Sequence, residues 1–416
     1  MSEPTPLRRN RDFVLLQAGQ LLSAFGSNMS RIAYPLLALA ATHSPAKAGY
    51  VGGVQFAPYL AFGLIAGVAA DRLERRRLMI VSETVAAAAL ATLAASVLVH
   101  ETRFWLILAV AFVDGTAGVF SGSAMRGAFR AVVPLAQLPT AASVAQTRAA
   151  AVRLAAPPVG GALFAVGRAL PFLADAVSYA FSALSALLMR TRFQETRELD
   201  PAPLRRQFAE GVSFYARIPF LRTTMAMISV SNFTVTGVQL AVIVLARREG
   251  LSSTAIGGFV ALVGATTLLG SLATPLVRRV LPMRAILLSE FWAAFGYIAF
   301  LVWPSVFVLA AVFAAQAFCF PNTDSAMTAY NYALIPDRLL GRALSVGDTL
   351  RVAGAPLGPL AAGLLLDSVS PRATIAVLMG ATLAMTLLGT LSRSIREMPP
   401  LEEVTAVYTE SAGVAL

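Results

Sequence analysis

The sequence has a single cysteine, two histidines and a single lysine among its 416 residues. Cys319 has no second cysteine to pair with, which excludes an intrachain disulfide and a cysteine metal cluster. His43 and His100 fall in short polar segments, so a zinc site lacks its ligands, and neither a metal nor a cofactor is expected. Lys47 lies outside any GxxxxGK(S/T) pattern, which excludes ATP as a fuel bound through a P-loop. With no Ser/His/Asp set in sight, the sequence does not predict an enzyme.

Charged residues are also scarce. They make up 13% of the chain and hydrophobic residues 57%, against about 25% and roughly 45–50% in soluble domains. The mean hydropathy is +0.70, and a core surrounded by water stops growing near about 250–300 residues. The apolar side chains therefore face a lipid bilayer, and since one crossing takes about 20 residues, the chain has room for about a dozen helices. Composition predicts an all-α membrane protein.

Twelve apolar runs are bounded by charged residues, glycine or proline, which predicts twelve transmembrane helices. The first run is too long for a signal peptide. The runs cover residues 13–41, 46–70, 78–99, 104–125, 142–166, 170–189, 221–245, 254–277, 284–302, 305–330, 344–366 and 373–392.

The arginines are distributed unequally between the two sides of these runs. Of 33 basic residues, 24 lie in loops on the side of the amino terminus and six on the other. The positive-inside rule then places both termini in the cytoplasm. The net charge of +11 thus reflects topology, and nucleic acid is not expected as a partner. Arginine in place of lysine, with abundant alanine, is typical of a GC-rich bacterial source and favours the cell membrane.

The chain repeats itself. At an offset of 202, residues 156–161 (APPVGG) match 358–363 (GPLAAG), and at an offset of 207, residues 82–83 match 289–290. We expect six-helix bundles over 1–190 and 221–396, a cytoplasmic linker over 191–220 with a short surface helix near 208–215, and a cytoplasmic tail over 397–416. In transporters built from repeats, the substrate site lies between them near the midplane.

The segment after the second run carries Gly67, Asp71, Arg72 and Arg76. It resembles the signature loop of the major facilitator superfamily, G-x-x-x-D-R-x-G-R-R/K, with Glu74 in place of the second glycine. The resemblance implies a gating role for Gly67, Asp71, Arg72 and Arg76. Physically, we expect Gly67 to allow close helix packing, Asp71 to meet a facing helix end and the arginines to bind lipid headgroups.

The fifth run contains Ala156, Pro157, Gly160 and Gly161 in a pattern similar to the G-P-x-x-G-G of antiporters in this superfamily. Small residues let helices approach, and proline bends a helix. Two interpretations remain for Pro157, Gly160 and Gly161: a gating bend, which the resemblance implies, or an ordinary packing bend.

Further stretches resemble the drug:proton antiporter branch that includes macrolide and siderophore exporters; they begin at Asn10, Pro171 and Ile335. The chain departs from this branch at Ser27, where many members have an aspartate, and at Ala111, where an arginine is common. Coupling through these two positions is therefore not expected.

A charge inside the bilayer is costly, so intramembrane ionisable groups are functional candidates. Asp114, Asp324 and Asp175 are our candidates for proton coupling, because a desolvated carboxylate can exchange protons near neutrality. The alternatives are a fixed ion pair with Arg31 or Arg351 and, for Asp175 near a helix start, a structural role through the helix dipole. Asp348 and Arg351, three residues apart, are added to the gating set.

Polar and aromatic residues at helical spacing predict the wall of a water-filled cavity. The alternative is hydrogen bonding between helices without transport. The candidates for substrate contact are Gln20, Asn28, Arg31, Gln55, Tyr59, Asn232, Thr236, Gln239, Gln316 and Phe320.

These features together predict secondary active efflux of a small amphipathic molecule, such as a drug, an antibiotic or a siderophore-like metabolite, by proton antiport with alternating access. The expected partners are the substrate, protons and the lipid bilayer, and a monomer is expected. The alternatives are an uptake permease or uniporter, or, from another class, a membrane receptor, scaffold or enzyme.

Overall fold

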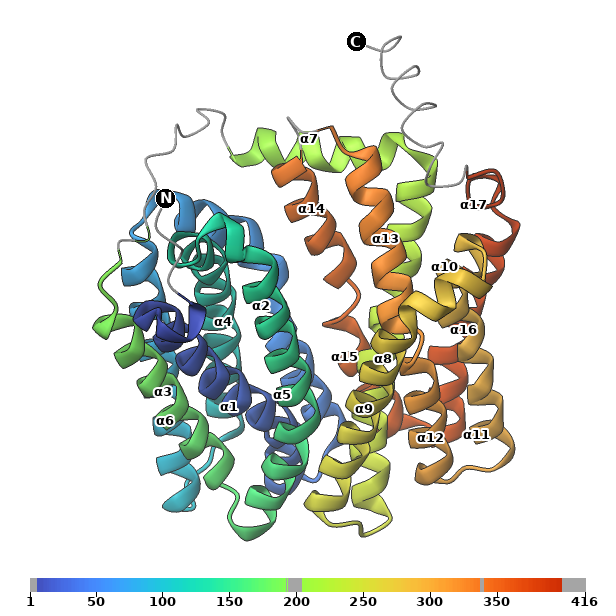
Figure 1. Cartoon of the computed structure of the whole chain (residues 1–416). Helices are drawn as coiled ribbons and strands as arrows, with labels where there is room; N and C mark the ends of the chain where they lie inside the picture. Colours follow the sequence, from blue (N-terminus) through green and yellow to red (C-terminus); the bar gives the residue numbers. More distant parts are fainter. Residues whose placement is uncertain (1–5, 192, 194–203, 337–339, 399–416) are drawn as a thin grey trace. The chain divides into compact units, whose positions relative to one another are not determined.

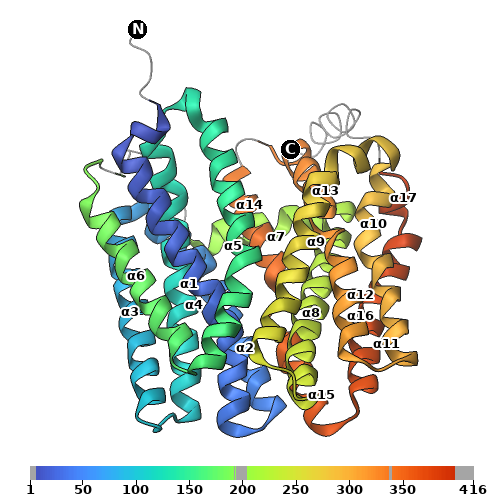
Figure 2. The same cartoon turned by 60° about the horizontal axis from the view of Figure 1, so that its bottom comes forward.

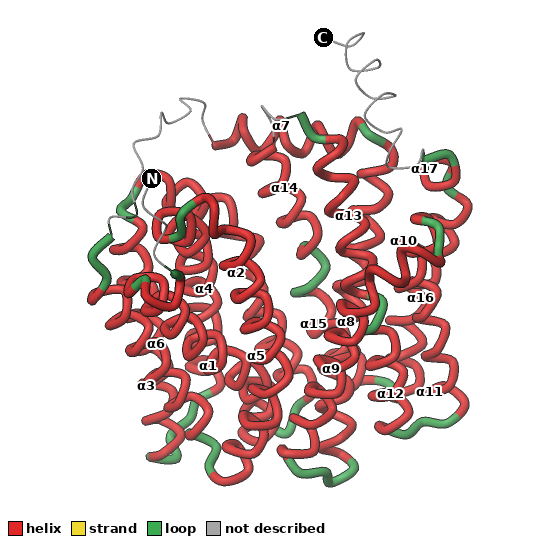
Figure 3. Tube along the Cα trace, viewed as in Figure 1, coloured by secondary structure: helices red, strands yellow, loops and turns green. Residues whose placement is uncertain are grey.

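A computed structural model describes residues 6–191, 193, 204–336 and 340–398. Over these residues the chain is almost entirely helical and contains no strand (Figure 3). The predicted all-α class is confirmed.

The long helices follow the twelve predicted runs. Eleven helical segments of the described chain are long and apolar enough to cross a membrane. The remaining long helix, α1, has 32 residues and is also long enough, but residues such as Asn28 and Arg31 make it less apolar. The twelve segments are α1 (Arg11–Thr42), α2 (Pro45–Arg72), α3 (Arg75–Leu98), α4 (Phe104–Val132), α5 (Leu138–Val166), α6 (Leu170–Leu188), α8 (Pro219–Arg248), α9 (Ser253–Val280), α10 to α11 (Met283–Val302), α12 with α13 (Val306–Ala317, Phe320–Leu334), α14 with α15 (Leu340–Val352, Leu357–Ser368) and α16 (Pro371–Leu391).

Helix ends are set by local chemistry. Ser44 and Ser370 accept hydrogen bonds from backbone N–H groups three residues ahead, at 3.3 and 3.2 Å, and each is followed by a proline at the first helical position. Such caps satisfy N–H groups that the helix itself leaves free. His43 and His100 have φ of 55° and 58°, so both histidines end helices in the left-handed conformation.

The contacts divide the chain into two compact units, Met1–Pro201 with Ile243–Leu262, and Ala202–Val242 with Val263–Leu416. In the first unit, α6 packs between α1 and α3, while α4 packs against α2 and α3 (Figures 1 and 2). A buried cluster that includes Phe13, Leu16, Met79 and Met189 joins the start of α1 to the end of α6. This end of the unit is thus a packed core.

In the second unit, the segment related by repeat to α5 is broken. Helix α14 ends at Val352 and α15 begins at Leu357, whereas α5 continues through its prolines. The side chain of Asn232 donates to Arg351 O (3.1 Å) and that of Thr236 to Ala355 O (2.9 Å). Helix α8 therefore supplies donors to carbonyls that the break leaves without helical partners.

The predicted surface helix is present as α7 (Leu204–Arg217). It runs across the end of α14 rather than along it (Figure 1). Tyr215, 2% exposed, packs over Gly347, where an added Cβ would lie 2.3 Å from its hydroxyl. Burial and the nearby carboxylate of Asp348 raise the pKa of Tyr215 to about 12.

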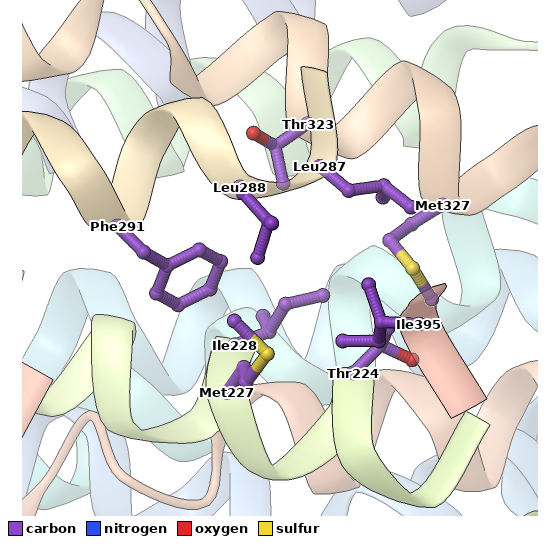
Figure 4. A pocket seen from close by; sticks show the side chains of 9 residues that line it. All are labelled: Thr224, Met227, Ile228, Leu287, Leu288, Phe291, Thr323, Met327 and Ile395. Atoms are coloured by element: carbon purple, nitrogen blue, oxygen red, sulfur yellow. The ribbon is translucent and has the colours of Figure 1, made fainter. Parts of the chain in front are cut away.

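A small apolar cavity lies between α8, α10, α13 and the short helix α17 (Arg393–Arg396) (Figure 4). Its volume is about 10 Å³, roughly the space of one water molecule. Met227, Leu288, Met327 and Ile395 contribute to its wall. Ile395 is 2% exposed, so α17 closes the cavity.

Candidate functional site

The loop between α2 and α3 is tied to the end of α6. Arg76 donates to the carbonyls of Ala186 (2.8 Å) and Leu187, and Arg75 donates to Phe193 O (3.1 Å). The last carbonyls of a helix have no helical partners and attract positive charge. Arg75 and Arg76 therefore bind carbonyl groups of the protein, and the expectation that the arginines of this loop bind lipid headgroups stays a prediction.

The other gating candidates of this loop are at the surface. Asp71 and Arg72 are exposed, and Asp71 Oδ1 lies 3.5 Å from Arg75 Nη2. An added Cβ on Gly67 would meet no atom of the described chain within 4 Å. The close packing expected at Gly67 is therefore not found here.

The start of α1 fastens the same end of the unit. Asn10 caps α1 at Phe13 N (3.1 Å) and donates to Val132 O at the end of α4 (3.0 Å). The Asp12 carboxylate accepts from the backbone N–H of Arg190 (3.1 Å) and of Thr191 (2.7 Å) and from the Thr191 hydroxyl (2.5 Å). Burial opposes the charge, but these hydrogen bonds outweigh it and hold the pKa of Asp12 below its usual value.

A polar cluster lies deeper in the first unit, where α1, α4 and α6 meet. Asp114 Oδ1 accepts from the Tyr179 hydroxyl (2.9 Å), and Asp114 Oδ2 accepts from the Tyr34 hydroxyl (3.2 Å). The Ser27 hydroxyl donates to the Tyr179 oxygen (3.0 Å). Asp114 of α4 is thus held by hydroxyls from two other helices, α1 and α6, and is connected to Ser27 through Tyr179.

Asp175 belongs to the same cluster. Its side chain is fully buried, Oδ1 accepts from Ser178 (3.1 Å), and Oδ2 has no hydrogen-bond partner among the described residues. Asp114 and Asp175 are close enough to repel one another, and Arg31 is close enough to attract both. An added Cβ on Gly26 would lie 2.4 Å from Asp175 Oδ1, so the glycine of α1 makes room for this carboxylate.

The sequence predicted Asp114 and Asp175 separately but missed Tyr34, Tyr179 and Ser27 as their partners. Phe172, Asp175 and Tyr179 lie three and four residues apart in the resemblance motif that begins at Pro171. This spacing places them on one face of α6, and the structure packs Phe172 edge-on against Tyr34, with ring centroids 5.1 Å apart. Helical spacing within the motif was the signal that could have identified Tyr179.

In the second unit, Asp324 forms an ion pair with Arg351, which was the stated alternative to proton coupling. Glu290, 8% exposed, accepts from the Ser231 hydroxyl, as Glu83 in the first unit accepts from Ser121 (2.9 Å). No three His, Cys, Asp or Glu side chains of the described chain are grouped as a metal site. In the second unit, therefore, an arginine compensates the charge of the acid, whereas in the first unit two acids interact with one another.

The substrate candidates differ in exposure. Gln316 is 1% exposed, accepts from the Tyr297 hydroxyl (2.7 Å) and donates to Glu290 O (3.2 Å), so its amide is engaged inside the unit. Asn232 and Thr236 make the bonds between helices described above, which was the alternative for the stripe on α8. The other candidates form two groups. The half-buried ones are Gln20, Asn28, Gln55, Gln239 and Phe320, and the exposed ones are Arg31 and Tyr59.

The glycines of α5 make close contacts. An added Cβ on Gly160 would lie 2.8 Å from Met29 Cα of α1, and one on Gly161 would lie 2.2 Å from Ser253 O at the start of α9. Both glycines therefore allow helices to approach, as predicted physically. Pro157 lies inside α5 without interrupting it.

Residues 1–411 match the family model described as transmembrane secretion effector. The chain is 25% identical over 395 residues to the multidrug efflux pump Tap of Mycolicibacterium fortuitum, covering 91% of this chain and 94% of Tap. It is 24% identical over 204 residues to macrolide efflux protein A of Streptococcus pyogenes, covering 48% and 50% of the two chains.

Among solved structures, the chain is similar to a bacterial homologue of the human lysosomal transporter Spinster, captured inward-facing and unoccupied. The TM-score is 0.66 at 16% identity, over 98% of this chain and 99% of the other. At that identity the likeness bears on the fold alone.

Proposed function

Since the chain belongs to the transmembrane secretion effector family, within the major facilitator superfamily, we propose that it exports small amphipathic molecules. Relatives named multidrug efflux pump and macrolide efflux protein support this direction and this substrate class. The chain is a multi-pass membrane protein. We place it in the cell membrane with both termini in the cytoplasm, acting as a monomer and leaving its substrate chemically unchanged.

The polar cluster of Asp114 and Asp175 is the observation that carries our proposal of proton coupling. Two neighbouring acids in the apolar interior of a helix bundle repel one another when both are ionised, so keeping both charged is costly. Asp175 has an oxygen without a partner, and Asp114 is held by two hydroxyls. We propose that protons bind here in exchange for substrate leaving, with Asp324 secondary because Arg351 compensates its charge.

Alternating access requires that protonation favour one of two arrangements of the repeated halves. The cluster joins α1, α4 and α6, so a change in its charge acts on the packing of three helices at once. Gly160 and Gly161 let α5 approach its neighbours closely, and we propose that these contacts open and close as the halves move. The proposed gating set also includes Asp71, Arg72 and Arg76 of the loop, and Asp348 with Arg351. The two proposed halves are residues 1–190 and 221–396.

Reconstituted vesicles test this proposal. An imposed pH gradient is expected to drive accumulation of a fluorescent amphipathic dye in inside-out vesicles, and Asp114→Asn and Asp175→Asn are expected to abolish the driven accumulation. Asp367→Asn, an exposed acid of α15, serves as the control. Dye accumulation that does not depend on the pH gradient and is unchanged in both variants would reject proton antiport. Equilibration without accumulation would instead support the uniporter, which the missing acid at Ser27 favours.

A further inference from the structure

A second polar feature of the first unit lies apart from the acidic cluster. A pocket of about 540 Å³ opens between α1, α4 and α5. Its residues come from the first turns of α1, the last turns of α4 and the first turns of α5, which is the end of the unit that Asn10 and Asp12 fasten. This volume lies in the usual range of small-molecule sites, about 300–1,000 Å³.

The pocket is one-sided in charge. Arg126 and Arg148 both line it, and no aspartate or glutamate is among the described residues of its wall. In the described chain neither arginine takes part in an ion pair. This differs from the acidic cluster, where Arg31 faces two carboxylates.

The hydrogen bonds of these arginines are incomplete. Arg148 donates through Nη1 to Gln17 Oε1 (2.5 Å), while its Nε is buried without a partner among the described residues. Arg126 donates to Ser123 Oγ (3.3 Å). Gln17 therefore holds one edge of the Arg148 guanidinium and leaves further donors for an incoming acceptor. Carboxylate, sulfonate and phosphate oxygens are the acceptors that match a guanidinium best.

Apart from Gln17 and Gln146, the rest of the described wall is apolar. Leu16, Met125, Phe129 and Leu138 line the same pocket. Methionine and phenylalanine offer adaptable and flat surfaces to an apolar body. A ligand that satisfies both parts of the pocket has an anionic head and an apolar tail.

We propose that this pocket binds the anionic group of an amphipathic molecule, so that the exported substrates include amphipathic acids. The inference rests on the proposed export function and specifies its substrate class. The same chemistry is found in a soluble organic acid and in an anionic lipid headgroup, and the test separates these two sources.

Binding to the purified full-length protein in nanodiscs tests the inference without transport. The probes are 11-(dansylamino)undecanoic acid and its methyl ester, which share fluorophore and chain and differ in charge. In discs of phosphatidylcholine alone, we expect the acid to bind roughly tenfold or more tightly than the ester. Arg126→Gln with Arg148→Gln should remove this preference. Arg153→Gln, which takes the same charge from α5 outside the pocket wall, should retain it.

Discs containing phosphatidylglycerol separate the sources. If the lipid competes with the acid in the wild type but not in the double variant, the pocket takes lipid headgroups; if it does not compete, the pocket takes the soluble acid. Equal affinity for acid and ester, or a preference that survives in a double variant of unchanged thermal stability, would overturn the inference. Because Asp114→Asn leaves this pocket intact, driven transport that persists in this variant while acid binding is retained would reject the coupling proposal alone.

Discussion

The hydroxyl of Tyr179 provides the sharpest test of the acidic cluster. Tyr179→Phe removes the donor that lies 2.9 Å from Asp114 Oδ1 and leaves the ring, which is 4% exposed, in its packing. A hydrogen bond to a charged acceptor contributes about 1.5–3 kcal/mol, and about 1.4 kcal/mol corresponds to a tenfold change. If proton exchange at Asp114 is what drives export, the driven rate should fall roughly tenfold to hundredfold.

Tyr34→Phe extends the test to the other oxygen of Asp114. Its hydroxyl lies at 3.2 Å, so the loss should be smaller than for Tyr179→Phe. Tyr332→Phe, at a side chain that is 59% exposed, controls for loss of a hydroxyl as such.

The assay compares two rates in vesicles: accumulation driven by a pH gradient, and exchange of labelled for unlabelled substrate without a gradient. A coupling role predicts that Tyr179→Phe lowers the first rate and spares the second. Loss of both rates together with a lower melting temperature would mean that Tyr179 only holds the bundle together. Wild-type driven accumulation in Tyr179→Phe would refute the assignment of Asp114.

Three further predictions concern stability. Asp12→Asn should lower the free energy of unfolding by about 2 kcal/mol at neutral pH. The pKa of Asp12 is lower in the folded than in the unfolded chain, so the stabilisation by Asp12 is complete above the unfolded pKa near 3.8 and is lost as pH falls through the folded pKa. The melting temperatures of the variant and the wild type should therefore converge below about pH 4. Gly26→Ala should cost about 1–3 kcal/mol and impair coupling, since its Cβ would lie 2.4 Å from Asp175 Oδ1. Ile395→Ala should cost about 2 kcal/mol by enlarging the cavity that α17 closes (Figure 4).

Each of these variants has a matched control. Asp367→Asn removes an exposed acid, Gly118→Ala adds a methyl group where no atom of the described chain lies within 4 Å, and Ile298→Ala shortens a side chain that is 46% exposed. Thermal unfolding followed by tryptophan fluorescence measures all six. If a variant and its control have the same melting temperature, the contact that the variant removes or disturbs does not stabilise the fold.

The helices could be predicted because one physical constraint acts on each of them. A crossing must be apolar for about 20 residues, and arginine, glycine or proline mark its ends, so the runs correspond to helices with small shifts at their ends. Helix α4 is the largest departure, since it continues to Val132, beyond the predicted end at 125. There its last turns pack into the cluster of Phe13 and Leu16, and tertiary packing extends the helix past the apolar run.

The repeat predicted equivalent positions but not their conformations. Residues 156–161 lie inside the continuous helix α5, whereas the matching segment follows a break between Val352 and Leu357. Gly354 stands in that break, where an added Cβ would lie 1.9 Å from Ser229 O. The break therefore depends on a contact with α8, which an offset between two stretches of sequence cannot contain.

The acidic cluster shows why the site was only half predictable. Composition identifies each intramembrane acid, because each is costly in lipid, but the rotation of a helix about its axis decides which acids meet. Ser27 occupies the position at which the family pattern has an acid, and in this chain it reaches Asp114 through the hydroxyl of Tyr179. With Gly26 beside it leaving room for Asp175, Ser27 lies next to a cluster whose acids come from α4 and α6. Acids from other helices thus meet beside Ser27 in this chain, and because the sequence pattern of α1 alone cannot show them, a missing motif residue does not by itself exclude proton coupling.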